Sequence, residues 1–146
     1  NVIRKSFRTV ADEFGFTEGN APRFTAFAVT VERLDYQLHV ENRPMYAWYD
    51  GEKILGYYSL LPQDNQECEL NNLCVLPECR HKGLGKALLN HAFQTAKSMN
   101  FQKINIGIVE ENQILRKWYE SCGFVHTETK KFTFFPFTCG YMVKQL

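Results

Sequence analysis

The sequence predicts one mixed α/β (α+β) domain in which helices flank a mostly antiparallel central sheet. Its 146 residues suffice for a single hydrophobic core, and they contain no repeat, linker or low-complexity segment. Apolar residues make up 45% of the chain and charged residues 23%, as in globular proteins, which argues against disorder. The patterns follow the order helix, helix, three strands, helix, strand, helix, two strands, which predicts an antiparallel first half.

Two helical stripes occupy the first forty residues, where apolar side chains recur at helical spacing. The first stripe consists of Ile3, Phe7, Val10, Ala11 and Phe14. A loop follows, marked by Gly15, Gly19, Asn20 and Pro22. The second predicted helix carries Phe24, Phe27, Ala28, Val31, Leu34 and Leu38.

Three extended runs follow Pro44 and predict consecutive strands. Asp50-Gly51 is a strong hairpin signal between the first two runs, and Pro77 ends the third. The predicted strands are Met45–Tyr49, Ile54–Leu61 and Cys68–Leu76.

A long helix, a strand, a short helix and two strands complete the predicted order. Gly83 and Gly85 open the long helix, whose wide apolar face suits packing on a sheet. Asn112 is predicted to cap the short helix, and Gly123 to end it. The predicted ranges are 83–100 for the long helix, 104–108 for the strand, 112–120 for the short helix, and 124–134 and 137–145 for the last strands.

Charge and cysteine usage limit the expected partners and location. Seventeen basic and sixteen acidic side chains give a net charge of +1, which supports neither nucleic acid nor a membrane as a partner. No apolar run is long enough to span a bilayer. The five cysteines form no C-x-x-C pair, so the cytoplasm is the predicted location and no metal site is expected.

The most informative segment lies between a predicted strand and a predicted helix. It reads Arg80-His81-Lys82-Gly83-Leu84-Gly85-Lys86. Its glycines permit a tight turn and a close approach of the backbone to a ligand. The free N–H groups and the dipole of the helix start favour an anion, and Arg80, Lys82 and Lys86 add positive charge. The segment therefore predicts a pyrophosphate site, with a structural turn carrying solvated lysines as the alternative.

Two better-known phosphate motifs do not fit this segment. A Walker A loop needs glycine where the chain has Arg80, and serine or threonine where it has Ala87. A dinucleotide-binding fingerprint needs a third glycine where the chain has Leu88. A nucleotide-binding protein unrelated to coenzyme A is therefore the least favoured hypothesis.

Two blocks of the chain resemble the GNAT N-acetyltransferase superfamily. Arg80-x-x-Gly83-x-Gly85 is similar to the family's Q/R-x-x-G-x-G/A signature, which cradles the pyrophosphate of acetyl-CoA. The block NQILRKWYESCGF, residues 112–124, resembles the family's Asn–x6–Tyr–x3–Gly–Phe segment. The resemblance implies a single N-acetyltransferase domain over residues 1–146, with the family's first strand expected upstream of Asn1.

The resemblance also implies where acetyl-CoA, the expected co-substrate, would bind. The strands around the long helix should splay at a bulge near Cys74 and Val75. The free backbone of Leu73, Cys74 and Val75 would pair with the pantetheine arm, and the Val75 N–H would polarise the thioester carbonyl. Asn112 would bond the pantetheine or serve only as a helix cap. The remaining predicted contacts are Arg80, His81, Lys82, Gly83, Leu84, Gly85 and Lys86.

Two side chains are the candidate catalytic groups. An ammonium, with a reference pKa of about 10, must lose a proton before it attacks. Glu69 falls where the histone-acetyltransferase branch keeps its catalytic glutamate, so it is the candidate base, directly or through water, with Glu67 as fallback. Tyr119 occupies the family's tyrosine position and is the candidate acid for the departing thiolate. The alternatives are a solvated or salt-bridged glutamate and a core tyrosine.

The amine acceptor is not identified by the sequence. In the family it enters opposite the cofactor, over the first two helices and their loop. These carry aromatic and acidic residues that suit an amine with apolar bulk, or that pack in the core: Phe14, Phe16, Phe24, Phe27, Glu13 and Glu18. A small-molecule amine, a peptide N-terminus and a lysine side chain stay open, as does a homodimer. A non-catalytic acyl-CoA sensor is the alternative function.

Overall fold

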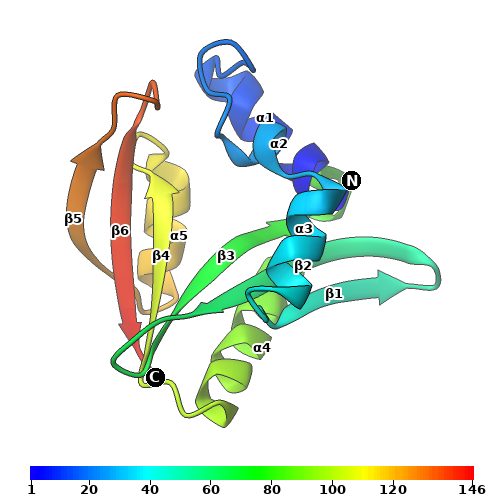
Figure 1. Ribbon diagram of the computed structural model, residues 1–146, viewed down its shortest axis with the longest axis vertical. Coiled ribbons are helices and arrows are strands. Elements are labelled where there is room, and N and C mark those ends of the chain that lie inside the picture. The colour runs from blue at the N-terminus through cyan, green and yellow to red at the C-terminus, as the bar shows by residue number, and fades with distance from the viewer.

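A six-stranded sheet with the order β1-β2-β3-β4-β6-β5 forms the centre of the fold (Figure 1). The computed structural model describes residues 1–146. The strands are β1 (Met45–Asp50), β2 (Lys53–Pro62), β3 (Glu67–Val75), β4 (Lys103–Val109), β5 (Val125–Lys131) and β6 (Thr138–Gln145). Only β3 and β4 are parallel, and the other neighbours are antiparallel. The predicted mixed, mostly antiparallel sheet is thus confirmed.

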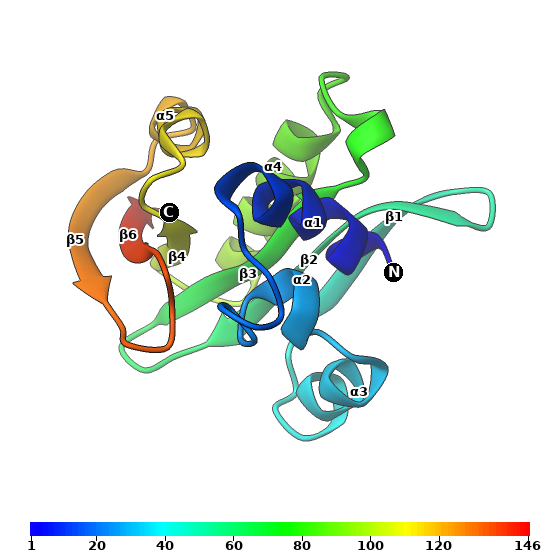
Figure 2. The ribbon, with the colours of Figure 1, turned by 90° about the horizontal axis from the view of Figure 1, so that it is seen from above.

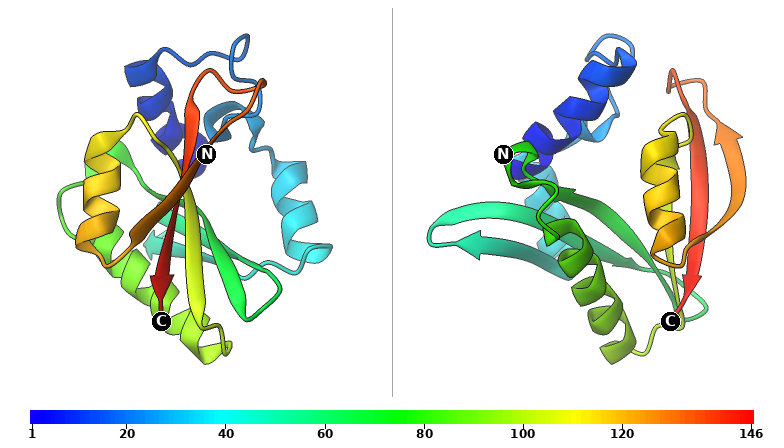
Figure 3. Two further views of the ribbon diagram at one scale, coloured as in Figure 1. Left: turned by 90° about the vertical axis from the view of Figure 1, so that its left-hand side faces the viewer. Right: turned by 180° about the vertical axis from the view of Figure 1, so that it is seen from behind.

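Helices cover both faces of the sheet. They are α1 (Val2–Phe14), α2 (Thr25–Ala28), α3 (Val31–His39), α4 (Leu84–Ser98) and α5 (Gln113–Ser121), with a 3-10 turn η1 (Pro77–Cys79). Figure 3 shows α4 and α3 on opposite sides of the strands. Because both faces of β2 are covered, its residues 56–60 are buried without alternation. None of the helices has the length and apolarity that crossing a bilayer requires.

The apolar face of α4 packs on β2 and β3 to form the largest core cluster. Leu88, Leu89 and Phe93 of α4 meet Tyr58 and Leu60 of β2 in this cluster. Gly56 of β2 allows the close approach, because a Cβ built there would lie 2.5 Å from Leu88 Cδ1. The predicted amphipathic long helix is therefore confirmed, and it sets the position of the loop that precedes it.

Adding one methyl group at this contact should destabilise the protein. In Gly56→Ala the new Cβ would also lie 3.0 Å from the Cys74 carbonyl oxygen, so backbone must move. We expect a loss of about 1–3 kcal/mol in the free energy of unfolding, measured by urea titration. Gly107→Ala in β4 is the control, since its Cβ would meet Tyr141 at 3.7 Å, an ordinary contact. Equal stabilities of the two variants would contradict this packing.

The region of the second predicted helix contains two helices, α2 and α3. The prediction of one continuous helix from Phe24 to Leu38 was therefore wrong. The chain is extended at Val29, which is buried against the sheet, and at Thr30. Thr30 is the N-cap of α3, and its Oγ1 accepts a hydrogen bond from the Arg33 N–H at 3.1 Å. A capping threonine in extended backbone ends one helix and starts the next.

Strands β3 and β4 pair only at their beginnings and then diverge. Their register covers Glu67–Glu69 and Lys103–Asn105 alone. Figures 1 and 2 show the result, with β1–β3 on one side and β4–β6 with α5 on the other. The second half of β3 therefore has no strand partner on its β4 side.

A bulge in β3 accompanies this divergence. Asn71 pairs with Ser59, whereas Cys74 pairs with Tyr57, so β3 carries one extra residue at this point. Asn72, within the bulge, has a positive φ of 55°, a conformation that asparagine tolerates better than most residues. The bulge was predicted near Cys74 and Val75, and it lies just before them.

Candidate active site

The end of β3 presents backbone groups away from its one strand partner. The Leu76 N–H donates to the Leu55 carbonyl at 2.8 Å. Because alternate residues of an antiparallel strand face the partner, the preceding residue, Val75, turns its N–H and C=O away from β2. The Val75 carbonyl accordingly accepts from the Ser6 hydroxyl at 3.1 Å. The Val75 N–H thus faces the side on which β3 and β4 diverge.

The loop before α4 presents free backbone amides, as the predicted anion site requires. Gly83 has φ 83° and is the N-cap of α4. The backbone N–H groups of residues 81–86 donate to no acceptor in the chain, and the first bonded amide is that of Ala87, which donates to the Gly83 carbonyl at 3.0 Å. Six consecutive free donors at the start of a 15-residue helix suit an anion, so we call this segment the candidate anion site. The exposed side chains of Lys82 and Lys86 add positive charge there.

The Arg80 side chain does not point to this anion site, contrary to its predicted position. Its guanidinium donates to the Ser6 carbonyl at 2.9 Å, to Thr9 Oγ1 at 3.0 Å and to the Val75 carbonyl at 3.3 Å. These bonds attach the loop to α1 and to the end of β3. Arg80 therefore positions the loop, and its guanidinium N–H groups donate to carbonyl and hydroxyl oxygens of the protein.

Three elements meet at the N-terminal end of α4. A Cβ built on Gly85 would lie 3.8 Å from Trp118 Cζ2 and 3.9 Å from Val75 Cγ2. The loop, α5 and the end of β3 are therefore neighbours, as the two sequence motifs implied.

Tyr119 lies next to this junction on α5. Its side chain is 7% exposed and packs against Trp118 and Phe124, with ring centroids 4.9 and 5.4 Å away. Burial raises the pKa of Tyr119, and the nearby thiols of Cys122 and Cys74 raise it further. Tyr119 belongs to the same core cluster as Val75, at the end of β3. Its hydroxyl is protonated at neutral pH.

Asn112 is the N-cap of α5, as predicted. Its Oδ1 accepts a hydrogen bond from the Leu115 N–H at 3.2 Å. The side-chain NH₂ has no partner within the chain, so the residue can cap the helix and still donate to a ligand.

Glu69 of β3 lies on the face opposite α4 and is half-buried. Desolvation raises the pKa of its carboxyl, although Arg43 and a hydrogen bond from Gln63 Nε2, at 3.2 Å, act in the opposite direction. Glu67, the fallback base, forms an ion pair with Lys103 at 3.3 Å. Glu69 and Val75 are six residues apart, about 20 Å along an extended strand. An amine beside Val75 would therefore lie beyond the direct reach of Glu69, and only a chain of several waters could connect the two.

The aromatic residues predicted to meet the acceptor belong largely to a second core. Phe16 and Phe24 are buried with Phe137, which follows β5, at centroid distances of 4.9 and 5.8 Å. This cluster joins the α1–α2 loop to the β5–β6 loop. Phe14 and Phe27 pack at its edge, and Glu13 and Glu18 are exposed.

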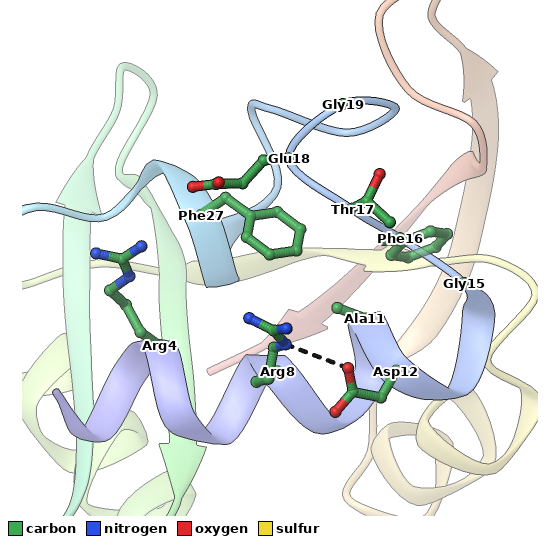
Figure 4. A pocket seen from close by; sticks show the side chains of 10 residues that line it. All are labelled: Arg4, Arg8, Ala11, Asp12, Gly15, Phe16, Thr17, Glu18, Gly19 and Phe27. Carbon is green, nitrogen blue, oxygen red and sulfur yellow. Dashed lines mark hydrogen bonds and ion pairs between the residues drawn. The ribbon is translucent and has the colours of Figure 1, made fainter.

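Two of the pockets border the helices α1–α3. The larger, of about 580 Å³, is formed by α1, the following loop and Phe27 (Figure 4). The smaller, of about 240 Å³, reaches β3 and includes Glu69, Asn71 and Asn72. No group of three or more His, Cys, Asp or Glu side chains could hold a metal ion.

The comparisons with known proteins agree with this geometry. The acetyltransferase (GNAT) family model matches residues 9–124. The chain belongs to the GNAT acetyltransferase family. It is 29% identical over 134 residues to the Escherichia coli protein named uncharacterized N-acetyltransferase YjgM, covering 87% of this chain and 77% of that protein.

Other members are related over shorter stretches or by fold alone. The Bacillus subtilis protein named uncharacterized N-acetyltransferase YvbK is 30% identical over 86 residues, which are 59% of this chain and only 56% of that protein. A GNAT acetyltransferase from Elizabethkingia anophelis, solved with acetyl-CoA bound, superposes with a TM-score of 0.70 and 23% identity. That match covers 80% of this chain and 84% of the other, and it shows the shared fold.

Proposed function

We propose that this chain transfers the acetyl group of acetyl-CoA to a primary amine, which attacks the thioester directly. The observation that carries this proposal is the run of six free amides at the start of α4 beside the unpaired end of β3. Family membership and the acetyl-CoA bound to the Elizabethkingia relative support it.

The backbone would supply most of the cofactor contacts. The amides of residues 81–86, helped by Lys82 and Lys86, would hold the diphosphate of acetyl-CoA. The free edge of β3 at residues 73–75 would pair with the amides of the pantetheine arm, and the Asn112 NH₂ would donate to it. The Val75 N–H would stabilise the negative charge that develops on the thioester oxygen.

Two side chains would accept and donate the protons of the reaction. Glu69, acting through water, would take the proton that the ammonium must lose before its nitrogen attacks the acetyl carbon. As the new C–N bond forms, the C–S bond breaks and coenzyme A leaves as a thiolate. Tyr119, which burial keeps protonated, would donate to that sulfur.

Titration calorimetry with acetyl-CoA and S-acetylpantetheine tests the cofactor assignment. We expect micromolar or tighter binding of acetyl-CoA and loss of most affinity for S-acetylpantetheine, which lacks the diphosphate. Coenzyme A release over a panel of amines then separates the enzyme from an acyl-CoA sensor, which would bind without turnover. Absence of binding, or equal binding of both ligands, would overturn the assignment.

The role of Glu69 predicts a specific pH dependence. A base must be deprotonated, so kcat/KM should fall as the pH drops through the pKa of Glu69, which burial raises above its usual value of about 4.3. Glu69→Gln should remove this acidic limb and lower kcat/KM about tenfold or more. Glu67→Gln, which removes the charge that pairs with Lys103, is the control. If Glu67→Gln, and not Glu69→Gln, removed the acidic limb of the pH profile, the base would be Glu67.

The location and assembly of the protein are further proposals. The five cysteines are all free, which suits the reducing cytoplasm predicted from the sequence. A homodimer remains a prediction, and light scattering after size-exclusion chromatography tests it.

A further inference from the structure

The smaller pocket, of about 240 Å³, lies between α2–α3 and the β2–β3 face opposite α4. We call it the arginine pocket. Its charged and amide lining consists of Arg23, Arg33, Arg43, Gln37, Glu69 and Asn71. Asn72, at the bulge of β3, also lines it. The bulge is three residues from Val75, so the pocket begins about 10 Å along the strand from the proposed reaction centre.

The arginine pocket carries more positive than negative charge. Arg23 and Arg33 have no carboxylate partner in the chain, and the Arg23 guanidinium rests on the Phe134 ring at 4.3 Å. Arg43 is 9% exposed and pairs through Nε with Glu41, which leaves the rest of its guanidinium fork unbonded. Glu69 is the one carboxylate in the lining. Three guanidinium groups around one small volume suit an anion, since each can bind a carboxylate through two parallel hydrogen bonds.

One buried polar atom in the lining of the arginine pocket has no hydrogen-bond partner. Gln37 is 5% exposed, lines the pocket, and its buried Oε1 has no hydrogen-bond partner. Buried polar groups are almost always bonded, so this oxygen indicates a polar ligand or ordered water beside it. An amide oxygen and the Glu69 carboxylate accept hydrogen bonds from an ammonium, whereas the guanidinium groups donate to an anion.

The larger pocket lacks these features. Its Arg8 is paired with Asp12 at 3.2 Å (Figure 4), and the Nε of its Arg4 donates to the Ala26 carbonyl at 3.1 Å. No residue of β3 or of the loop before α4 lines it. The amine acceptor is therefore better placed in the arginine pocket.

We propose that the arginine pocket binds the acceptor and selects a small amine that also carries an anionic group, such as an amino carboxylate. This inference rests on the proposed acetyl transfer and adds the substrate class. The volume of the arginine pocket suits a ligand smaller than a drug-sized molecule. Positive charge at the pocket disfavours diamines and polyamines.

The proposal is tested with amines that have the same chain length but differ in the charge of the group at the end opposite the reacting amine. The set is 4-aminobutanoate, 4-aminobutanamide and 1,4-diaminobutane, and a shorter set is 3-aminopropanoate, its amide and 1,3-diaminopropane. We expect kcat/KM for each amino carboxylate to exceed that of its amide and diamine about tenfold or more, the effect of one charge-assisted hydrogen bond. Phosphoethanolamine distinguishes the anion: if it surpasses 3-aminopropanoate, the selected group is a phosphate. Equal kcat/KM values for the amino carboxylate, its amide and the diamine, or a higher value for the diamine, would overturn the proposal.

A charge reversal on an exposed arginine of the pocket supplies the matched variant. Arg33→Glu on α3 should reduce the preference for amino carboxylates over diamines about tenfold or more, without loss of acetyl-CoA affinity. Arg8→Glu makes the same charge change on α1, at the larger pocket, and should leave the preference unchanged. A shift caused by Arg8→Glu but not by Arg33→Glu would overturn the choice of pocket.

A binding measurement keeps this inference separate from the transfer reaction. With coenzyme A present, 4-aminobutanoate should raise the melting temperature of the unmodified protein and not that of Arg33→Glu. If acetyl-CoA binds and amines are acetylated without regard to far-end charge, only the substrate class fails. If no amine is acetylated, the transfer reaction fails, and the melting temperatures alone decide whether the arginine pocket binds an anionic amine.

Discussion

Tyr119→Phe is expected to lower kcat about 100-fold or more while leaving the affinity for acetyl-CoA nearly unchanged. The substitution removes one hydroxyl and keeps the ring that packs against Trp118 and Phe124. If the phenol donates to the departing sulfur, the loss falls on the chemical step and not on cofactor binding. Coenzyme A release with the best amine gives kcat, and titration calorimetry gives the affinity.

A second buried tyrosine provides the control for this prediction. The Tyr58 hydroxyl bonds to His91 Nδ1 at 2.7 Å, on the α4 face of the sheet and apart from the proposed centre. Tyr58→Phe should therefore reduce stability but leave kcat within about twofold. Full activity of Tyr119→Phe would refute the acid assignment, and a parallel loss of acetyl-CoA affinity would reassign Tyr119 to binding.

Gly83→Val should weaken acetyl-CoA binding about 100-fold or more, the loss of two or more charge-assisted hydrogen bonds. Gly83 has φ 83°, which a β-branched residue adopts only with strain. Relief of that strain would rotate the neighbouring peptides and turn the free amides of the loop away from the anion site. Titration calorimetry with acetyl-CoA measures the effect.

Gly15→Val separates the loss of the anion site from general backbone strain. Gly15 ends α1 with φ 73°, and, as at Gly83, a Cβ there would meet no atom within 4 Å. Both variants should lose similar stability, whereas only Gly83→Val should lose cofactor affinity. Unchanged affinity in Gly83→Val would mean that the loop amides do not hold the diphosphate.

Local signals account for the parts of the fold that were predicted correctly. Asp50-Gly51 forms the predicted hairpin, with Asp50 paired to Lys53. Asn112 caps α5, and Gly123 follows that helix with φ 95°. These features depend on a few adjacent residues, so the sequence pattern identifies them.

Contacts between distant segments account for what the sequence did not reveal. Arg80 bonds to Ser6 and Thr9, more than seventy positions earlier, so its orientation could not follow from the loop motif. The arginine pocket likewise combines residues from α3, the segment before β1, and β3. One signal was available: Glu69 and Asn71 alternate with buried Cys68 and Leu70, which marks a polar face of β3.

A crystal structure of the protein with acetyl-CoA tests the central claim most directly. We expect diphosphate oxygens within hydrogen-bonding distance of the amides of residues 81–86, and the thioester oxygen beside the Val75 N–H. Coenzyme A bound at another surface, or those amides bonded within the protein, would contradict both the cofactor site and the catalytic residues assigned from it.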